Sequence, residues 1–278
     1  MKTFVVILSV IVLSISEIYG QNFYATFHTG YGFGTAPREY INYTTTYNSN
    51  NNIYNSISKS VSFGEGYYLT CSFGYNINQI LSVELALQYS SSASQDFGSN
   101  YYFYSSQYSI YSEEVSGHSY LANPSILIST SINDFKPYLK IGPIIGIADL
   151  TVNSNNNYNN TNSTQITETQ TFLNGGVAFG YNAAIGVTYD VAQNIGLMLE
   201  INDRSLSYAP TKGELQKYTV DGVDKLPGLQ VYDKQIEFKD NITSTSNTQP
   251  NYNNPQQQPK VQYPFSSVAI SFGVKYSF

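Results

Sequence analysis

The most regular feature of the sequence is an alternation of side-chain types over its last eleven positions. Apolar side chains recur at every second residue from Val268 to Phe278. The residues between them are small or polar, and Lys275 is the one charged residue among them. A period of two predicts a β-strand with one apolar face and one polar face.

The same period recurs in seven earlier segments and predicts seven more strands. In the 120–130 segment, which is the least regular, Pro124, Ile126 and Ile128 are expected on the apolar face. Pro143 has no backbone N–H, so a bulge or a break in the ladder is expected where it falls. The seven segments are roughly 23–33, 67–75, 81–90, 120–130, 138–147, 177–189 and 195–204.

The connections between these strands alternate in length. The short ones contain Asn or Asp, as tight hairpins require, whereas the others are long. Short turns on one rim and long loops on the other are typical of an antiparallel up-and-down transmembrane β-barrel. Eight strands also place both chain ends on the rim of short turns. The short connections are 76–79, 131–134 and 190–194, and the long ones are about 35–62, 91–117, 149–171 and 207–263.

The position of the charges favours this barrel over a soluble β-sandwich. No Asp, Glu, Lys or Arg falls on the apolar face of any predicted strand, and the apolar rows end in Tyr or Phe. A charge facing lipid near the bilayer midplane costs about 2–4 kcal/mol. The opposite faces are rich in Gly, Ala and Ser, whereas the exposed face of a sandwich would carry more Lys and Glu. The sequence therefore predicts an all-β, eight-stranded transmembrane barrel with periplasmic turns and extracellular loops.

Five charged residues fall on the polar faces and are predicted to point into the barrel. An eight-stranded interior is too narrow for water to flow, and unpaired charges there are costly. An interior network of ion pairs is therefore the favoured interpretation. A narrow ion path or gate is the alternative. The five residues are Glu84, Lys140, Glu200, Arg204 and Lys275.

Composition adds three constraints. The chain has 27 Tyr, 15 Phe and no Trp, and only 12% of its residues are charged. This suits a surface that meets lipid through aromatic girdles, although a Tyr-rich extracellular sandwich would share it. The net charge of −6 without a basic stripe argues against a nucleic-acid partner. Cys71 is the one cysteine and cannot form an intramolecular disulfide.

The first 20 residues have the features of a signal peptide. Lys2 provides the positive start, an apolar run extends from Phe4 to Ile15, and Gly20 precedes an expected cut at Gln21. The run is too short to span a bilayer comfortably, which argues against an uncleaved anchor. We expect an exported chain with a signal peptide at 1–20 and a barrel at 21–278.

Several segments resemble the small outer-membrane β-barrel family that includes the OmpA transmembrane domain and OmpW-like proteins, in its Bacteroidota form. The resemblance lies in Gln21 at the cut, the opening strand from Phe23, the Pro137-Tyr-Leu-Lys-Ile-Gly segment and the final strand. It covers the strands, about half of the chain. It implies location in the outer membrane, contact with its lipid, and insertion by the barrel-assembly machinery. The signal for that machinery would be the final strand, with Phe272, Val274, Tyr276 and Phe278.

Candidate catalytic and metal-binding groups are scarce. The chain has only two histidines, His28 in a predicted polar row and His118 near a long connection. No nucleophile motif pairs with either of them. We therefore expect no enzyme activity, no cofactor and no metal site.

The long connections are the candidate functional surface. Two are rich in Asn, Thr and Tyr, and the fourth, 207–263, concentrates charges of both signs and ends in a Gln/Asn/Pro tract that predicts disorder. The expected function is structural or surface-interacting, through loops that contact an extracellular ligand or surface. The alternative is a narrow porin or a transporter of small apolar solutes.

Overall fold

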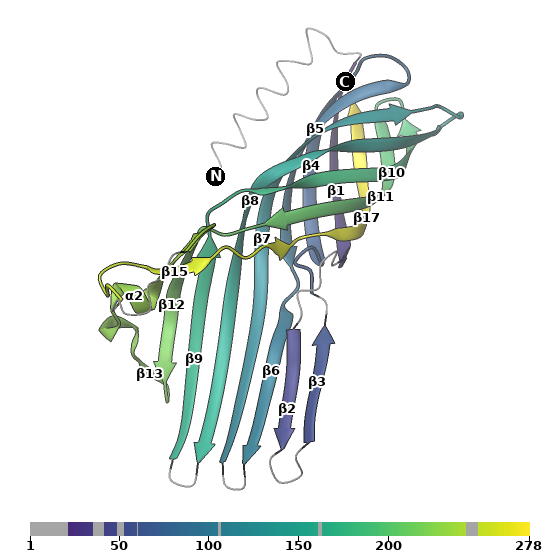
Figure 1. Cartoon of the computed structure of the whole chain (residues 1–278). Helices are drawn as coiled ribbons and strands as arrows, with labels where there is room; N and C mark the ends of the chain where they lie inside the picture. Colours follow the sequence, from purple (N-terminus) through teal and green to yellow (C-terminus); the bar gives the residue numbers. More distant parts are fainter. Residues whose placement is uncertain are drawn as a thin grey trace.

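The computed structural model describes residues 22–35, 42–48, 53–59, 61–104, 107–160, 163–242 and 250–278. The signal peptide predicted at 1–20 lies outside these residues. Eight strands form a ring in which each strand pairs antiparallel with two others (Figure 1). In order they are β1 (Phe23–Gly34), β4 (Gly66–Asn76), β5 (Leu81–Ser92), β7 (Gln107–Ser129), β8 (Phe135–Asn160), β10 (Ala178–Ala192), β11 (Ile195–Tyr208) and β17 (Ser267–Ser277), which returns to β1.

Each ring strand contains one of the eight strands predicted from the sequence, to within one residue at either end. The three short connections join β4 to β5, β7 to β8 and β10 to β11 at one end of the ring. Local side-chain chemistry fixes these turns. The Asn78 carboxamide accepts hydrogen bonds from the backbone of Ile80 and Leu81, and Asn133 adopts a positive φ of 56° that asparagine tolerates well.

The outward face of the ring is apolar and carries two belts of aromatic side chains. One belt lies near the short turns, where Phe23 packs on Tyr75 and Phe135 on Tyr189, both with ring centroids 4.9 Å apart. The second includes Tyr31 packed on Tyr67 at 5.0 Å and Tyr89 packed on Tyr120 at 5.1 Å. Eight residues separate the belts along β1 and β4, which is about 26 Å of strand.

Charged residues appear on the outward face only where the apolar rows end. Asp203 follows Ile201 on β11, and Asp149 follows Ile147 on β8 and pairs with His118 at 3.0 Å. The apolar rows predicted from the sequence thus face outward, and these acidic residues mark one border of the apolar band.

Beyond the second belt, the sheet continues as an extension instead of the predicted loops. β7 and β8 run on through it, and further strands add to their edges (Figure 1). The order is β3, β2, β6, β7, β8, β9, β12, β14 and β15, with parallel pairing only for β2 with β6 and β14 with β15. The added elements are β2 (Asn42–Asn48), β3 (Ile53–Lys59), β6 (Gln95–Tyr104), β9 (Ser163–Asn174), β12 (Lys212–Val220), β13 (Val223–Asp224), η1 (Leu226–Gly228), α2 (Val231–Lys234), β14 (Gln235–Lys239), β15 (Gln256–Pro259) and β16 (Tyr263–Pro264).

Most of the connections predicted to be long loops therefore consist largely of paired strands. Segments rich in Asn, Thr and Tyr lack an apolar face, which is why the period of two does not reveal them. These segments form strands because β7 and β8 leave the ring with their register already set. Each further residue that pairs with them then satisfies more backbone N–H and C=O groups. Even the Gln/Asn/Pro tract predicted to be disordered includes β15, which pairs with β14.

The hydrogen-bond ladder between β7 and β8 is broken at one rung in the middle of the apolar band. Pairing stops at Ala122 opposite Ile145 and resumes at Ile126 opposite Ile141. The Thr130 N–H donates to the Pro137 carbonyl across the seam between β7 and β8. Backbone N–H and C=O groups point to alternate sides along a strand, and those of Thr130 point towards β8. Pro124 lies an even number of residues from Thr130, so its nitrogen also points towards β8, where it faces the nitrogen of Pro143.

This proline rung lacks both of its N–H donors. About 13 Å of strand separates the paired rungs on either side of it. The Asn123 side-chain amide partly replaces them by donating to the Pro143 carbonyl at 2.7 Å. On the outward side, a groove of about 540 Å³ is lined by both prolines and by apolar residues of β4, β5, β7 and β8. The break that the sequence predicts at Pro143 is thus shared by two strands.

Replacing both prolines should repair the ladder. In P124A/P143A the two new N–H groups can pair across the seam, so amide hydrogen exchange in peptides covering 120–128 and 139–147 should slow. Global stability is a poor measure, because losing proline also raises the conformational entropy of the unfolded chain. Exposed Pro227 in η1 lies outside the ring, and P227A should leave exchange in both peptides unchanged. Unaltered exchange in the double variant would contradict the proline-rung explanation.

Candidate functional site: the interior of the ring

Three of the predicted charged residues meet at the centre of the ring. Glu84 on β5, Lys140 on β8 and Glu200 on β11 come from strands far apart in the sequence, and each lies on the inward face of its strand. All three are buried. The Lys140 Nζ lies 2.8 Å from Glu200 Oε2 and 3.4 Å from Glu84 Oε1. One lysine thus bridges two carboxylates.

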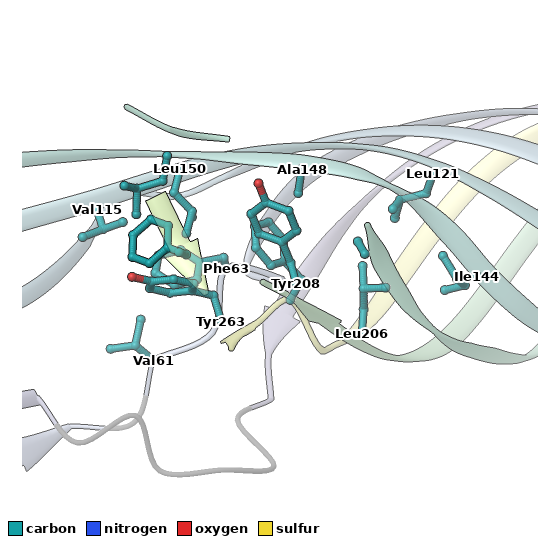
Figure 2. Packing of buried hydrophobic residues seen from close by; sticks show 14 residues of the cluster. Val61, Phe63, Val115, Leu121, Ile144, Ala148, Leu150, Leu206, Tyr208 and Tyr263 are labelled. Atoms are coloured by element: carbon teal, nitrogen blue, oxygen red, sulfur yellow. The ribbon is translucent and has the colours of Figure 1, made fainter. Parts of the chain in front are cut away.

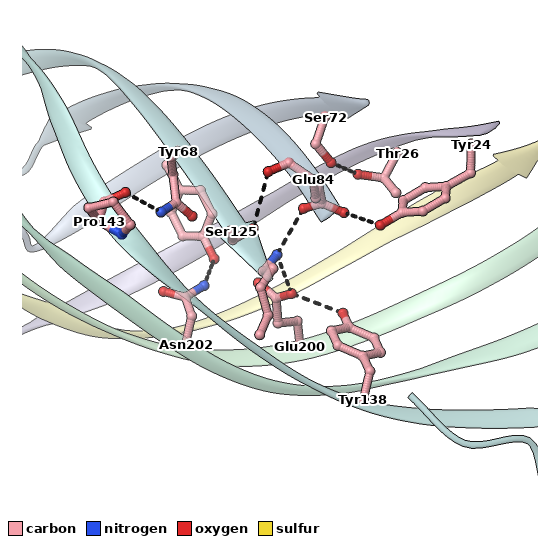
Figure 3. Close-up of polar contacts among 12 residues, drawn as sticks. Tyr24, Thr26, Tyr68, Ser72, Glu84, Ser125, Tyr138, Pro143, Glu200 and Asn202 are labelled. Carbon is pink, nitrogen blue, oxygen red and sulfur yellow. Dashed lines mark hydrogen bonds and ion pairs between the residues drawn. The ribbon is translucent and has the colours of Figure 1, made fainter. Parts of the chain in front are cut away.

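Two tyrosines complete this cluster. The Tyr24 hydroxyl donates to Glu84 Oε2 at 3.1 Å, and the Tyr138 hydroxyl donates to Glu200 Oε2 at 2.9 Å (Figure 3). Each carboxylate therefore receives hydrogen bonds from the lysine and from one tyrosine. Since buried charges are tolerated when they are paired and hydrogen-bonded, this arrangement explains how two acids and one base occupy the ring interior.

Each tyrosine lies over a glycine of the neighbouring strand. Tyr24 is the register partner of Gly74, and Tyr138 is the register partner of Gly186. A Cβ at either glycine would clash with the tyrosine ring. Neither tyrosine was predicted as a site residue. The available signal was a tyrosine in a polar row, but its glycine partner could be recognised only once the strand register was known.

The structure places the other two predicted charges elsewhere. The Lys275 Nζ lies 3.8 Å from the centroid of the Tyr24 ring, next to the central cluster but outside its ion pairs. Arg204 lies further towards the extension, where it donates from Nη2 to the Ser267 hydroxyl at 3.1 Å and to the Gly64 carbonyl at 3.4 Å. The five residues thus form a cluster of three, one neighbour and one separate cation.

An apolar cluster fills the interior between Arg204 and the extension. We call the segments 61–65 and 263–267 together the plug. The Phe63 N–H donates to the Pro264 carbonyl at 2.9 Å, and the Phe63 and Phe265 rings lie 5.6 Å apart. Phe63 and Tyr263 belong to one buried apolar cluster that extends along the wall to Leu150, Tyr208, Leu206, Leu121 and Ile144 (Figure 2).

The interior therefore has two filled layers, the ionic cluster and the plug. The opposite mouth, at the end of the short turns, is hollow. It forms a polar pocket of about 350 Å³ whose lining includes Lys275 and a rim ion pair, Lys136 with Asp190 at 2.5 Å. This order of layers suits a blocked ring better than an open water channel.

The two histidines, which were the candidate catalytic groups, lie far from each other on opposite faces of the wall. His28 is buried, with its ring centroid 6.4 Å from that of Tyr68. His118 lies on the outward side, stacked on Tyr89. Within the described ranges, no three His, Cys, Asp or Glu residues are grouped as a metal site. The same ranges contain no helix that has both the length and the apolar character to cross a membrane.

The residues of the predicted assembly signal form the outward row of β17. Phe272, Val274 and Tyr276 are exposed there, and the Phe278 N–H donates to the Phe23 carbonyl at 3.0 Å. Their strand joins β11 to β1 and so completes the ring. Their role in assembly stays a prediction.

The fold and its interior define a class of protein: an eight-stranded antiparallel β-ring with an apolar outer wall and a filled polar interior. No family model and no curated protein matches the chain. Among solved structures, Neisserial surface protein A (NspA) aligns with 92% of this chain and 97% of its own at 15% identity, with a TM-score of 0.31.

Removing the shared lysine should be costly. Lys140→Met leaves two buried carboxylates without their cation and should destabilise the folded protein by roughly 3–5 kcal/mol. Glu84→Gln and Glu200→Gln added to it should restore most of the loss. The measurement is urea unfolding of reconstituted protein. Lys136→Met, which breaks only the exposed rim pair, should change stability by less than about 1 kcal/mol. Equal losses in the two lysine variants would refute the bridging role.

The effect of adding a side chain should depend on which glycine is substituted, and it should be large at the glycine under Tyr138. Gly186→Ala puts a methyl group against the tyrosine ring and should cost about 1–3 kcal/mol. Gly228 has no atom within 4 Å of the position that a Cβ would take, so Gly228→Ala should be neutral. Unfolding midpoints of the two variants, measured side by side, test the difference. A neutral Gly186→Ala would show that Tyr138 can leave its place without loss.

Proposed function

We propose that this protein is an integral outer-membrane β-barrel that anchors a β-sheet extension for contact at the cell surface. The observation that carries the proposal is the outward wall of the ring, where apolar rows free of charge lie between two aromatic belts. In water such a surface would aggregate, whereas it matches the hydrocarbon core of a bilayer and its two interfaces. Hydrocarbon also requires that backbone N–H and C=O groups be paired, and the ring meets this requirement because each of its strands pairs on both edges.

The extension offers a polar surface that suits contact with other molecules. Glu168 and Lys217 pair across β9 and β12 at 2.7 Å, and this hydrogen bond lowers the pKa of the Glu168 carboxyl. Asn153 and Gln170 form the next contact on this face, at 2.9 Å. Because the strands continue directly from the wall, this surface is held rigidly at the ring. These features support a role in contact with other molecules.

Two matched substitutions test the membrane assignment. Leu199 on the ring and Ile166 on the extension are 42% and 41% exposed, so a soluble protein would tolerate arginine equally at both. In a membrane barrel, Leu199→Arg should strongly reduce the yield of folded protein in the outer membrane, since the charge faces lipid, whereas Ile166→Arg should not. The readout is the heat-dependent mobility shift in SDS gels. Equal yields of the two variants would contradict the proposal.

Conductance distinguishes the anchoring role from a narrow porin. With the ionic cluster and the plug in place, wild-type protein in planar bilayers should give no stable ion current. A steady current in wild type that falls in Lys140→Met would instead establish a charged conduction path and would replace the anchoring role by transport.

A further inference from the structure

Arg204 is a buried cation without an acidic partner in the described structure. It is 3% exposed and lies on the inward face of β11, between the ionic cluster and the plug. Its Nη2 reaches the Ser267 hydroxyl and the Gly64 carbonyl, which are both uncharged. Its other two nitrogens, Nε and Nη1, have no hydrogen-bond partner. A guanidinium does not release its proton in proteins, so the charge persists.

The neighbouring charges do not compensate for it. The carboxylates of Glu84 and Glu200 are shared by Lys140, and Lys275 lies beside them, so these four interior charges already cancel. Glu200 is four residues from Arg204 along the same face of β11, about 13 Å away. An isolated charge in a dry interior is unfavourable by many kcal/mol, so Arg204 requires a counter-charge that these side chains do not provide.

The positions around Arg204 carry neutral donors. Ser267 on β17 and Asn182 on β10 are its register partners, and both are buried. In the next rung, the Asn202 side chain donates to the Tyr68 hydroxyl at 2.8 Å. One cation surrounded by hydroxyl and carboxamide groups suits a small monovalent anion. Water could satisfy the two free N–H groups but would leave the charge unbalanced.

We propose that Arg204 binds a small inorganic anion of the halide class inside the ring, directly beneath the plug. The anion accepts hydrogen bonds from Nε and Nη1, while Nη2 keeps its contacts to Ser267 and to Gly64 of the plug. The bound anion neutralises the guanidinium and thereby stabilises the junction of β11, β17 and the plug. The proposal depends on the interior alone and is independent of what the extension contacts.

Bromide in place of chloride provides the direct test. Full-length processed protein crystallised from sodium bromide should show an anomalous peak within hydrogen-bonding distance of Arg204 Nε and Nη1. In solution, the melting temperature should be higher in sodium chloride than in sodium gluconate at equal ionic strength, by about 2–4 °C for a modest affinity. Arg204→Gln should abolish this difference. Lys275→Gln, which removes the other interior cation outside the ion pairs, should retain it.

The opposite results would overturn the site. A water molecule at Arg204 without an anomalous peak, and equal melting temperatures in the two salts, would show that the guanidinium needs no anion. If Arg204→Gln does not fold, Arg204→Lys takes its place: it keeps the charge and should keep a chloride dependence of the melting temperature. A chloride dependence that persists unchanged in Arg204→Gln would place the anion elsewhere. None of these outcomes affects the membrane assignment, which the Leu199 and Ile166 variants test separately.

Discussion

The backbone hydrogen bonds that join β17 to β1 are the constraint on which the rest of the structure depends. They give the first and last ring strands two neighbours each, so that no ring strand is left with an open edge. The proposed membrane location requires this condition, because hydrocarbon supplies no partner for a free N–H or C=O group. The aromatic belts and the polar interior follow from this one arrangement.

The same closure creates a second requirement in the interior. Eight strands enclose a space that side chains must fill, and the inward positions of a period-two pattern are the polar ones. The chain meets this requirement with an ionic cluster at one level and an apolar plug at another. Tyr24 and Tyr138 use the room left by glycines on adjacent strands to saturate the carboxylates. Filling and charge pairing are therefore achieved by the same residues.

Local periodicity was sufficient to predict the ring strands, their outward rows and the short turns, because each of these is encoded within about ten consecutive residues. Inward parity placed Glu84, Lys140 and Glu200 inside the ring, but it placed Arg204 and Lys275 in the same predicted network. The separation of Arg204 from that group did not follow from parity, since it depends on how far along the strand each residue lies once the register is set. The extension was missed for a related reason: its Asn- and Thr-rich strands are specified by their neighbours and carry no apolar face of their own.

The continuity of β7 and β8 has a mechanical consequence. These strands, of 23 and 26 residues, run from the short turns through the wall and into the extension without a hinge. A force applied at the far tip is therefore transmitted along the backbone as shear between the two strands. Within the wall, that shear meets its weakest resistance where Pro124 faces Pro143, because no backbone hydrogen bond joins the strands at that rung and the Asn123 side chain replaces it only in part. The position at which β7 and β8 are held together least tightly therefore lies within the apolar band.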